Sequence, residues 1–173
     1  MQDPVLETIK TSSGFYEKMY RYQCKCWYGF INQDFLLHYR YSQKWVDLYE
    51  ANENMKGIEA AQYIKGLHNL ISAFFDLRNL PKFKDTIALL ENFSEAPIVL
   101  NNKNNQIQCF IYLYIAKINQ HFLEGSFSEG LNMIPNMEAQ LQEIEPFVDS
   151  HRVLVFYYKI ACLYFGAGEP AKA

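Results

Sequence analysis

The stretch that decides the fold is residues 157–173, YYKIACLYFGAGEPAKA, at the C-terminal end of the chain. Ala161 precedes the aromatic Tyr164 by three residues, and Gly168 and Pro170 follow. A small residue on one helix lets a second helix approach, an aromatic side chain fills the space beside it, and glycine allows the chain to reverse. Proline suits the first turn of a helix, because that position needs no N–H donor. The order of residues therefore predicts an antiparallel helical hairpin.

Apolar residues recur at helical spacing along the rest of the chain, and no segment alternates in the manner of a strand between turn signals. The expected helices pair into hairpins at about 15–51, 57–94, 104–145 and 151–173, the last of which is incomplete. A short leading helix is expected at residues 5–10. We predict an all-α protein with one helical domain over residues 1–173, which forms part of a longer protein.

Polar and breaking residues mark where the expected helices end. Asn52 to Gly57 and the asparagine-rich Asn101 to Asn105 are expected as loops, and Pro135 as a break within a helix. Ser126 and Glu129 have the spacing of a capping box at the start of a helix.

Composition limits the classes of protein and partner. Half of the 173 residues are hydrophobic, which is enough for one substantial core, and the formal net charge is −3. No block of Lys or Arg indicates nucleic acid or an anionic membrane surface, and no apolar run reaches the roughly 18 residues of a membrane span. The N-terminus lacks the pattern of a signal peptide, so we expect a cytoplasmic location. The four cysteines, expected as reduced and buried thiols, are Cys24, Cys26, Cys109 and Cys162.

Residues at the expected turns recur at regular intervals. Phe35, Phe83 and Phe127 each follow a polar turn, Pro170 holds the equivalent place, and by subtraction they lie 48, 44 and 43 residues apart. Together with the small–aromatic–glycine–alanine order that ends at Ala173, this pattern resembles the tetratricopeptide repeat, whose standard unit has about 34 residues. The resemblance implies an α-solenoid, a right-handed superhelix of antiparallel helical hairpins.

The resemblance is complete only in the last unit. Gln33 and Pro81 stand where the first two units need the turn glycine, and Ile118 stands where the third needs a small residue. Long amphipathic helices with short turns suit a closed helical bundle equally well, so the bundle is the alternative fold. The chain ends inside a hairpin, which favours the solenoid, because each solenoid unit contacts only its neighbours.

The resemblance also implies a binding surface, because the first helix of each hairpin lines a concave groove in that family. Counting from each turn places seven residues there: Gln23, Trp27, His68, Arg78, Asn119, Phe122 and Tyr158. Aromatic side chains would supply contact area to a peptide, while Arg, Asn and Gln would pair with its polar groups. Core packing is the alternative role for Trp27 and Phe122, and plain surface for Arg78 and Asn119.

No motif indicates catalysis. The four histidines lie far apart, and the chain has no HExxH, CxxC or GxSxG motif and no glycine-rich phosphate loop. We expect no metal, no cofactor and no catalytic residue, and we predict a non-enzymatic scaffold for a protein or peptide partner. The alternatives are a structural segment of a larger helical protein and a regulatory or ligand-sensing helical bundle. The open C-terminal edge offers a further surface for self-association.

Overall fold

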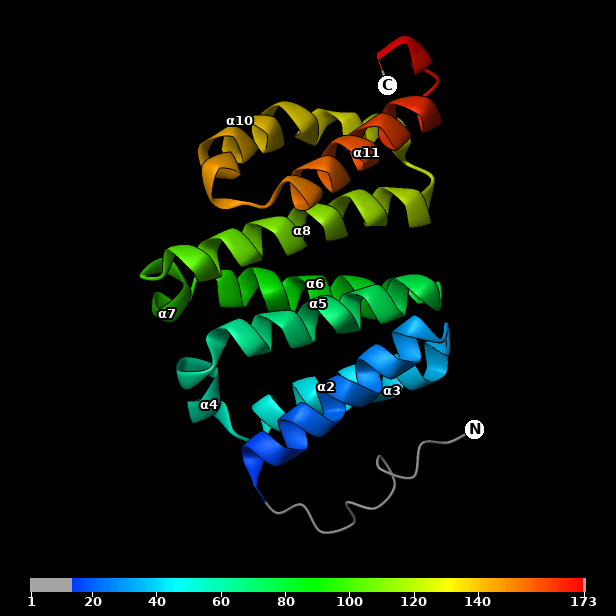
Figure 1. Cartoon of the computed structure of the whole chain (residues 1–173). Helices are drawn as coiled ribbons and strands as arrows, with labels where there is room; N and C mark the ends of the chain where they lie inside the picture. The colour runs from blue at the N-terminus through cyan, green and yellow to red at the C-terminus, as the bar shows by residue number, and fades with distance from the viewer. Residues whose placement is uncertain (1–13, 173) are drawn as a thin grey trace.

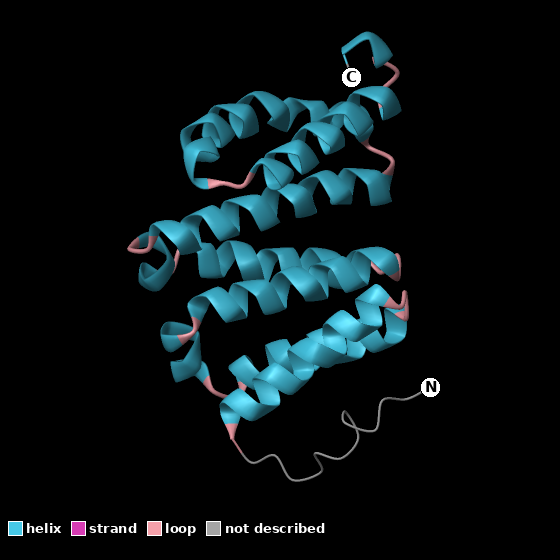
Figure 2. Cartoon of the chain, viewed as in Figure 1, coloured by secondary structure: helices cyan, strands magenta, loops and turns pink. Residues whose placement is uncertain are grey.

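The computed structural model describes residues 14–172. In this part of the chain all regular structure is helical and no strand occurs, which confirms the all-α prediction (Figure 2). The leading helix expected at residues 5–10 and the alanine at position 173 lie outside the described residues.

The long helices form pairs joined by tight turns (Figure 1). The pairs are α2 (Phe15–Ile31) with α3 (Phe35–Glu50), α5 (Ala60–Asp76) with α6 (Leu80–Ser94), and α8 (Lys103–Glu124) with α9 (Phe127–Gly130), η1 (Leu131–Met133) and α10 (Ile134–Ile144). After these, α11 (Ser150–Gly166) turns into the short η3 (Pro170–Lys172). The connections between pairs contain α4 (Glu53–Ile58), α7 (Pro97–Leu100) and η2 (Glu145–Phe147), at the edge opposite to the hairpin turns.

The pairs stack in the order of the sequence. Helix α3 packs on α5, both α5 and α6 pack on α8, and α8 packs on α11 (Figure 1). One cluster of buried apolar side chains extends from Met19 on α2 to Leu163 on α11. Its largest fully buried members include Trp45, Phe83 and Phe156.

All four hairpin turns have the same backbone conformation. Each has one residue with positive φ: Gln33 at 57°, Arg78 at 54°, Gly125 at 70° and Gly168 at 80°. The N–H of the following residue donates to the carbonyl five positions back, from Asp34 to Gly29 (2.9 Å), Asn79 to Phe74 (3.0 Å), Ser126 to His121 (3.1 Å) and Glu169 to Tyr164 (2.9 Å). This hydrogen bond and the left-handed residue define a Schellman motif. By subtraction, the left-handed residues are 45, 47 and 43 positions apart, so one type of hairpin turn recurs along the chain.

The second turn corrects the alignment expected from the sequence. Arg78, and not Pro81, is equivalent to the turn glycine, and Leu80, and not Phe83, begins the second helix. Pro81 lies in the first turn of α6, where its missing N–H has no intrahelical acceptor to lose. Phe83 is fully buried in the core instead.

Two expected loops are partly helical. Helix α4, at residues 53–58, covers most of the loop expected at 52–57. Helix α8 already begins at Lys103, because the Asn102 side chain accepts a hydrogen bond from the Asn105 N–H (3.1 Å) and caps the helix. The break expected at Pro135 occurs just before it, where η1 separates α9 from α10.

The capping box expected at Ser126 does not form. The Ser126 hydroxyl makes no cap hydrogen bond and lies 2.8 Å from Nδ1 of His121, at the end of the preceding helix. The serine therefore ties the turn to α8 rather than capping α9.

Gly29 and Gly166 lie at close contacts between helices. An ideal Cβ on Gly29 would lie 2.6 Å from the backbone N of His38, and one on Gly166 would lie 2.6 Å from the Phe127 ring. At these two points α2 lies so close to α3, and α11 so close to α9, that only glycine fits without a clash. Ala161 is half-buried and lines a shallow apolar groove on α11. The close helix approach expected at Ala161 remains a prediction.

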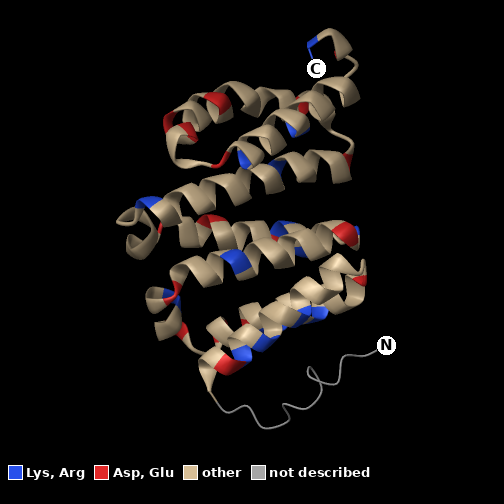
Figure 3. Cartoon of the chain, viewed as in Figure 1, with Lys and Arg blue, Asp and Glu red and all other residues tan. Residues whose placement is uncertain are grey.

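The surface of the described residues carries charges of both signs (Figure 3). The segment from α9 to η2 contains Glu but neither Lys nor Arg, whereas α2 and α3 carry five of them. Each described helix is too short or too polar to cross a membrane. All four cysteines are free thiols, but only Cys26 and Cys109 are buried; Cys162 is half-buried and Cys24 is exposed, which corrects the prediction that all four are buried.

Candidate functional site

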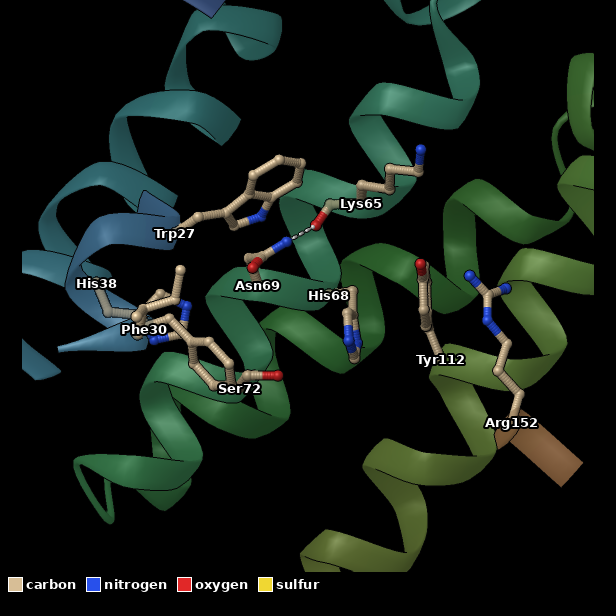
Figure 4. Close-up of a pocket in the computed structure, with 10 residues that line it drawn as sticks. Trp27, Phe30, His38, Lys65, His68, Asn69, Ser72, Tyr112 and Arg152 are labelled. Atoms are coloured by element: carbon tan, nitrogen blue, oxygen red, sulfur yellow. Dashed lines mark hydrogen bonds between the residues drawn. The ribbon is translucent and has the colours of Figure 1, made fainter. Parts of the chain in front are cut away.

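The first helices of the pairs line one cleft, with a volume of about 490 Å³ (Figure 4). Its walls are Trp27, Phe30 and Ile31 from α2, Lys65, His68, Asn69 and Ser72 from α5, Tyr112 from α8 and Arg152 from α11, with His38 added from α3. Every stacked pair thus contributes at least one side chain to the same cavity.

Helix α5 forms the polar floor of this cleft. Lys65, His68, Asn69 and Ser72 are spaced three, four and seven residues from the first of them, so they share one helix face. The Asn69 amide donates to the Lys65 carbonyl (2.8 Å), which orients it along the helix. The opposite face of α5 is apolar and buried in the core. Burial of that face leaves the polar face open to the cleft.

Helix α2 supplies an apolar wall that water reaches. Trp27, Phe30 and Ile31 are 51%, 59% and 77% exposed. Large apolar side chains this exposed, gathered beside a concave surface, are typical of a binding site.

The other end of the cleft is aromatic and positively charged. The His68 and Tyr112 rings stack with their centroids 3.9 Å apart and an interplanar angle of 8°. Arg152 lies beside Tyr112 (Figure 4), and its Nε is 3.1 Å from the Asp149 carboxylate. Lys65 and Arg152 are the formal charges in the lining, and none of the lining residues is acidic. Burial, together with the charge of Arg152, lowers the pKa of His68 to about 4, so its imidazole is neutral at pH 7.

His38 lies beneath the α2 wall and is fully buried. Neither of its ring nitrogens has a hydrogen-bond partner, and Nδ1 is 3.8 Å from the Asp76 carboxylate, beyond hydrogen-bonding distance. Burial lowers the pKa of His38, and burial also raises the pKa of Asp76. The T-shaped contact of His38 with Phe30, at 5.5 Å between centroids, connects this buried imidazole to the cleft wall.

Of the seven residues predicted for the binding face, the cleft brings together Trp27 and His68. Asn119 and Phe122 form a separate cluster around Lys159, whose Nζ donates to the Asn119 side chain (2.6 Å) and lies 5.7 Å from the Phe122 ring centroid. Phe122 is half-buried against the core.

The other three predicted residues lie apart from the cleft. Gln23 is buried, with 7% exposed, and its amide donates to Gln62 (3.0 Å), so it does not face a groove. Arg78 lies in the turn after α5, with its guanidinium 5.8 Å from the Phe75 ring centroid. Tyr158 is 69% exposed and lines a second, apolar groove on α11.

Most residues that line the cleft were not predicted from the sequence. The helical spacing of Lys65, Asn69 and Ser72 with His68 could have indicated the cleft, because it places a polar stripe on an otherwise apolar helix. The contributions of Tyr112 and Arg152 had no such signal, since they depend on how α8 and α11 stack on α5.

No group of three or more His, Cys, Asp and Glu side chains within residues 14–172 is arranged to hold a metal ion. Compared with known protein families, with curated proteins and with solved structures, the chain has no significant match.

Proposed function

We propose that this chain is a non-catalytic interaction module that binds a peptide segment of a partner protein in the cleft between α2, α5, α8 and α11. The observation that carries the proposal is that the first helix of each pair contributes side chains to this one cavity. A concave surface of aromatic and polar side chains, held on packed helices, binds a peptide with little cost of ordering itself.

The proposed architecture is a tetratricopeptide-like solenoid, a right-handed superhelix of hairpins in which the first helices face inward. Two findings support it: the Schellman turn recurs in all four hairpins, and successive pairs stack in sequence order. A cytoplasmic location remains part of the proposal.

Selection from a phage library of random 12-residue peptides tests this function. We expect enriched peptides whose affinity falls at least tenfold in the Trp27→Ala variant, because tryptophans that become buried at an interface contribute strongly to binding. Leu89→Ala is the matched control, since Leu89 is 44% exposed on α6 and does not line the cleft. Both variants should keep the wild-type circular dichroism spectrum. Failure to enrich any peptide, or equal loss in both variants, would contradict the proposal.

A second candidate is a structural segment of a larger helical assembly. It is favoured by the exposed apolar side chains of α11, where Leu154, Tyr158 and Phe165 are 68%, 69% and 73% exposed. These residues would also serve self-association. Analytical ultracentrifugation of the wild type and of Leu154→Ser/Phe165→Ser distinguishes this role, because a self-associating chain would become monomeric in the variant.

A further inference from the structure

The α8–α11 end of the cleft combines hydrogen-bond donors with an excess of positive charge. Arg152 presents a guanidinium whose Nε already pairs with Asp149, and the Tyr112 hydroxyl and the His68 ring line the same end. None of the lining residues is acidic; the Asp149 carboxylate, outside the lining, offsets part of the Arg152 charge, and Lys65 adds a second positive charge to the lining. A guanidinium beside other donors in an aromatic site is suited to a carboxylate, which it holds in a planar, directional arrangement.

We propose that this end of the cleft is an anion subsite that holds a side-chain carboxylate of an acidic peptide, and that at acidic pH His68 takes up a proton when the carboxylate binds. The inference rests on the proposed peptide-binding function and specifies the chemistry of the ligand. At the other end, Trp27, Phe30 and Ile31 hold an apolar side chain of the same peptide. The ligand is therefore a segment in which Asp or Glu lies a few residues from a large apolar residue.

Proton uptake follows from the groups that face His68. Arg152 and Lys159 on α11 and His38 on α3 act on its ring electrostatically, Tyr112 on α8 stacks on it, and Lys65 on α5 lines the same cleft. The carboxylate of Asp149, just before α11, pairs with Arg152 and offsets part of its charge. Burial, followed by the electrostatic influence of Arg152, His38 and Lys159, lowers the pKa of His68 to about 4, so the ring is neutral in the empty cleft at pH 7. A carboxylate within ~4–6 Å favours the charged imidazolium and raises the pKa by ~1–3 units.

The linkage between ligand and proton predicts tighter binding at lower pH. With a rise of about two units in the pKa of His68, affinity at pH 5.5 should be about fourfold higher than at pH 7.5. The peptide carboxylate does not oppose this change, because Asp and Glu with pKa values near ~4 remain mostly ionised at pH 5.5.

The experiment compares a library-selected peptide with its amide analogue, in which Glu is replaced by Gln or Asp by Asn. Wild-type protein should bind the acidic form at least tenfold more tightly, and Arg152→Met should remove this preference. Arg40→Met is the matched control, because Arg40 is exposed on α3 and does not line the cleft. The fourfold gain at pH 5.5 should be present in the wild type and absent in His68→Gln, with folding checked by circular dichroism at both pH values.

The outcomes separate this inference from the proposed function. Selected peptides without Asp or Glu, equal affinity for acid and amide, or pH-independent binding would overturn the anion subsite while leaving peptide binding in place. Absence of any selected peptide would overturn both.

Discussion

Replacing Gly29 by alanine tests the packing of the first hairpin. The new Cβ would lie 2.6 Å from the backbone N of His38 and 3.1 Å from its Cα, where ordinary contacts begin at about 3.4 Å. Because the obstacle is backbone, α2 and α3 must separate by nearly an ångström. Overpacking of this kind costs ~1–3 kcal/mol, while alanine gains at most ~1 kcal/mol in helix propensity. We therefore expect Gly29→Ala to lower the free energy of unfolding by about 1–2 kcal/mol.

Gly57→Ala is the matched control, because Gly57 lies in α4 and its Cβ would meet nothing within 4 Å. This variant should gain ~0.4–1 kcal/mol, since alanine restricts the unfolded chain. The assay is urea unfolding followed by circular dichroism at about 222 nm, with the slope of the transition compared among the three proteins. If Gly29→Ala were as stable as Gly57→Ala, the close contact between α2 and α3 would be wrong.

Two further predictions concern the turns and pH. Arg78→Gly should raise the free energy of unfolding by about 1 kcal/mol, because Arg78 has φ of 54° and only glycine adopts this region without cost. Gly125→Ala, at φ of 70°, should lower the free energy of unfolding by about the same amount. Thermal unfolding of the two variants checks both signs. Acid should destabilise the wild type through His68, whose pKa is about 4 in the folded chain and about 6.5 in the unfolded chain. Between these values the unfolded chain binds more protons, so stability is lost as the pH falls from about 6.5 towards 4. Urea unfolding should show a loss of about 1–2 kcal/mol between pH 7.5 and pH 5, smaller in His68→Gln, and an equal loss in both proteins would contradict the assignment.

The all-helical class of the fold could be predicted because apolar periodicity extends over whole helices, so a helix is recognised even where its ends are misplaced by a few residues. The alignment of the second turn could not. Leu80 and Pro81 read as a break, yet proline is tolerated in the first turn of a helix, and α6 begins there. The left-handed conformation of Arg78 has no signature in sequence, since arginine has no preference for it and the turn imposes it.

The candidate site was predicted less completely, for a similar reason. Helical spacing identifies which residues share a face, as for His68 and Asn69 on α5, but stacking of the pairs decides which faces meet. Gln23 was expected in the groove but is buried, because its side chain extends to α5 and donates to Gln62. Arg152 was overlooked, because its place in the cleft depends on α11 reaching across from the last pair.

The central claim is that one ligand contacts the first helix of every pair. Hydrogen–deuterium exchange with and without a library-selected peptide tests it most directly, since bound segments exchange more slowly. A peptide bound in the cleft should add protection in α2, α5, α8 and the first turns of α11, with little change in α3, α6 and α10. Protection confined to the outer face of α11 around Leu154 and Tyr158, or spread over the second helices, would contradict it.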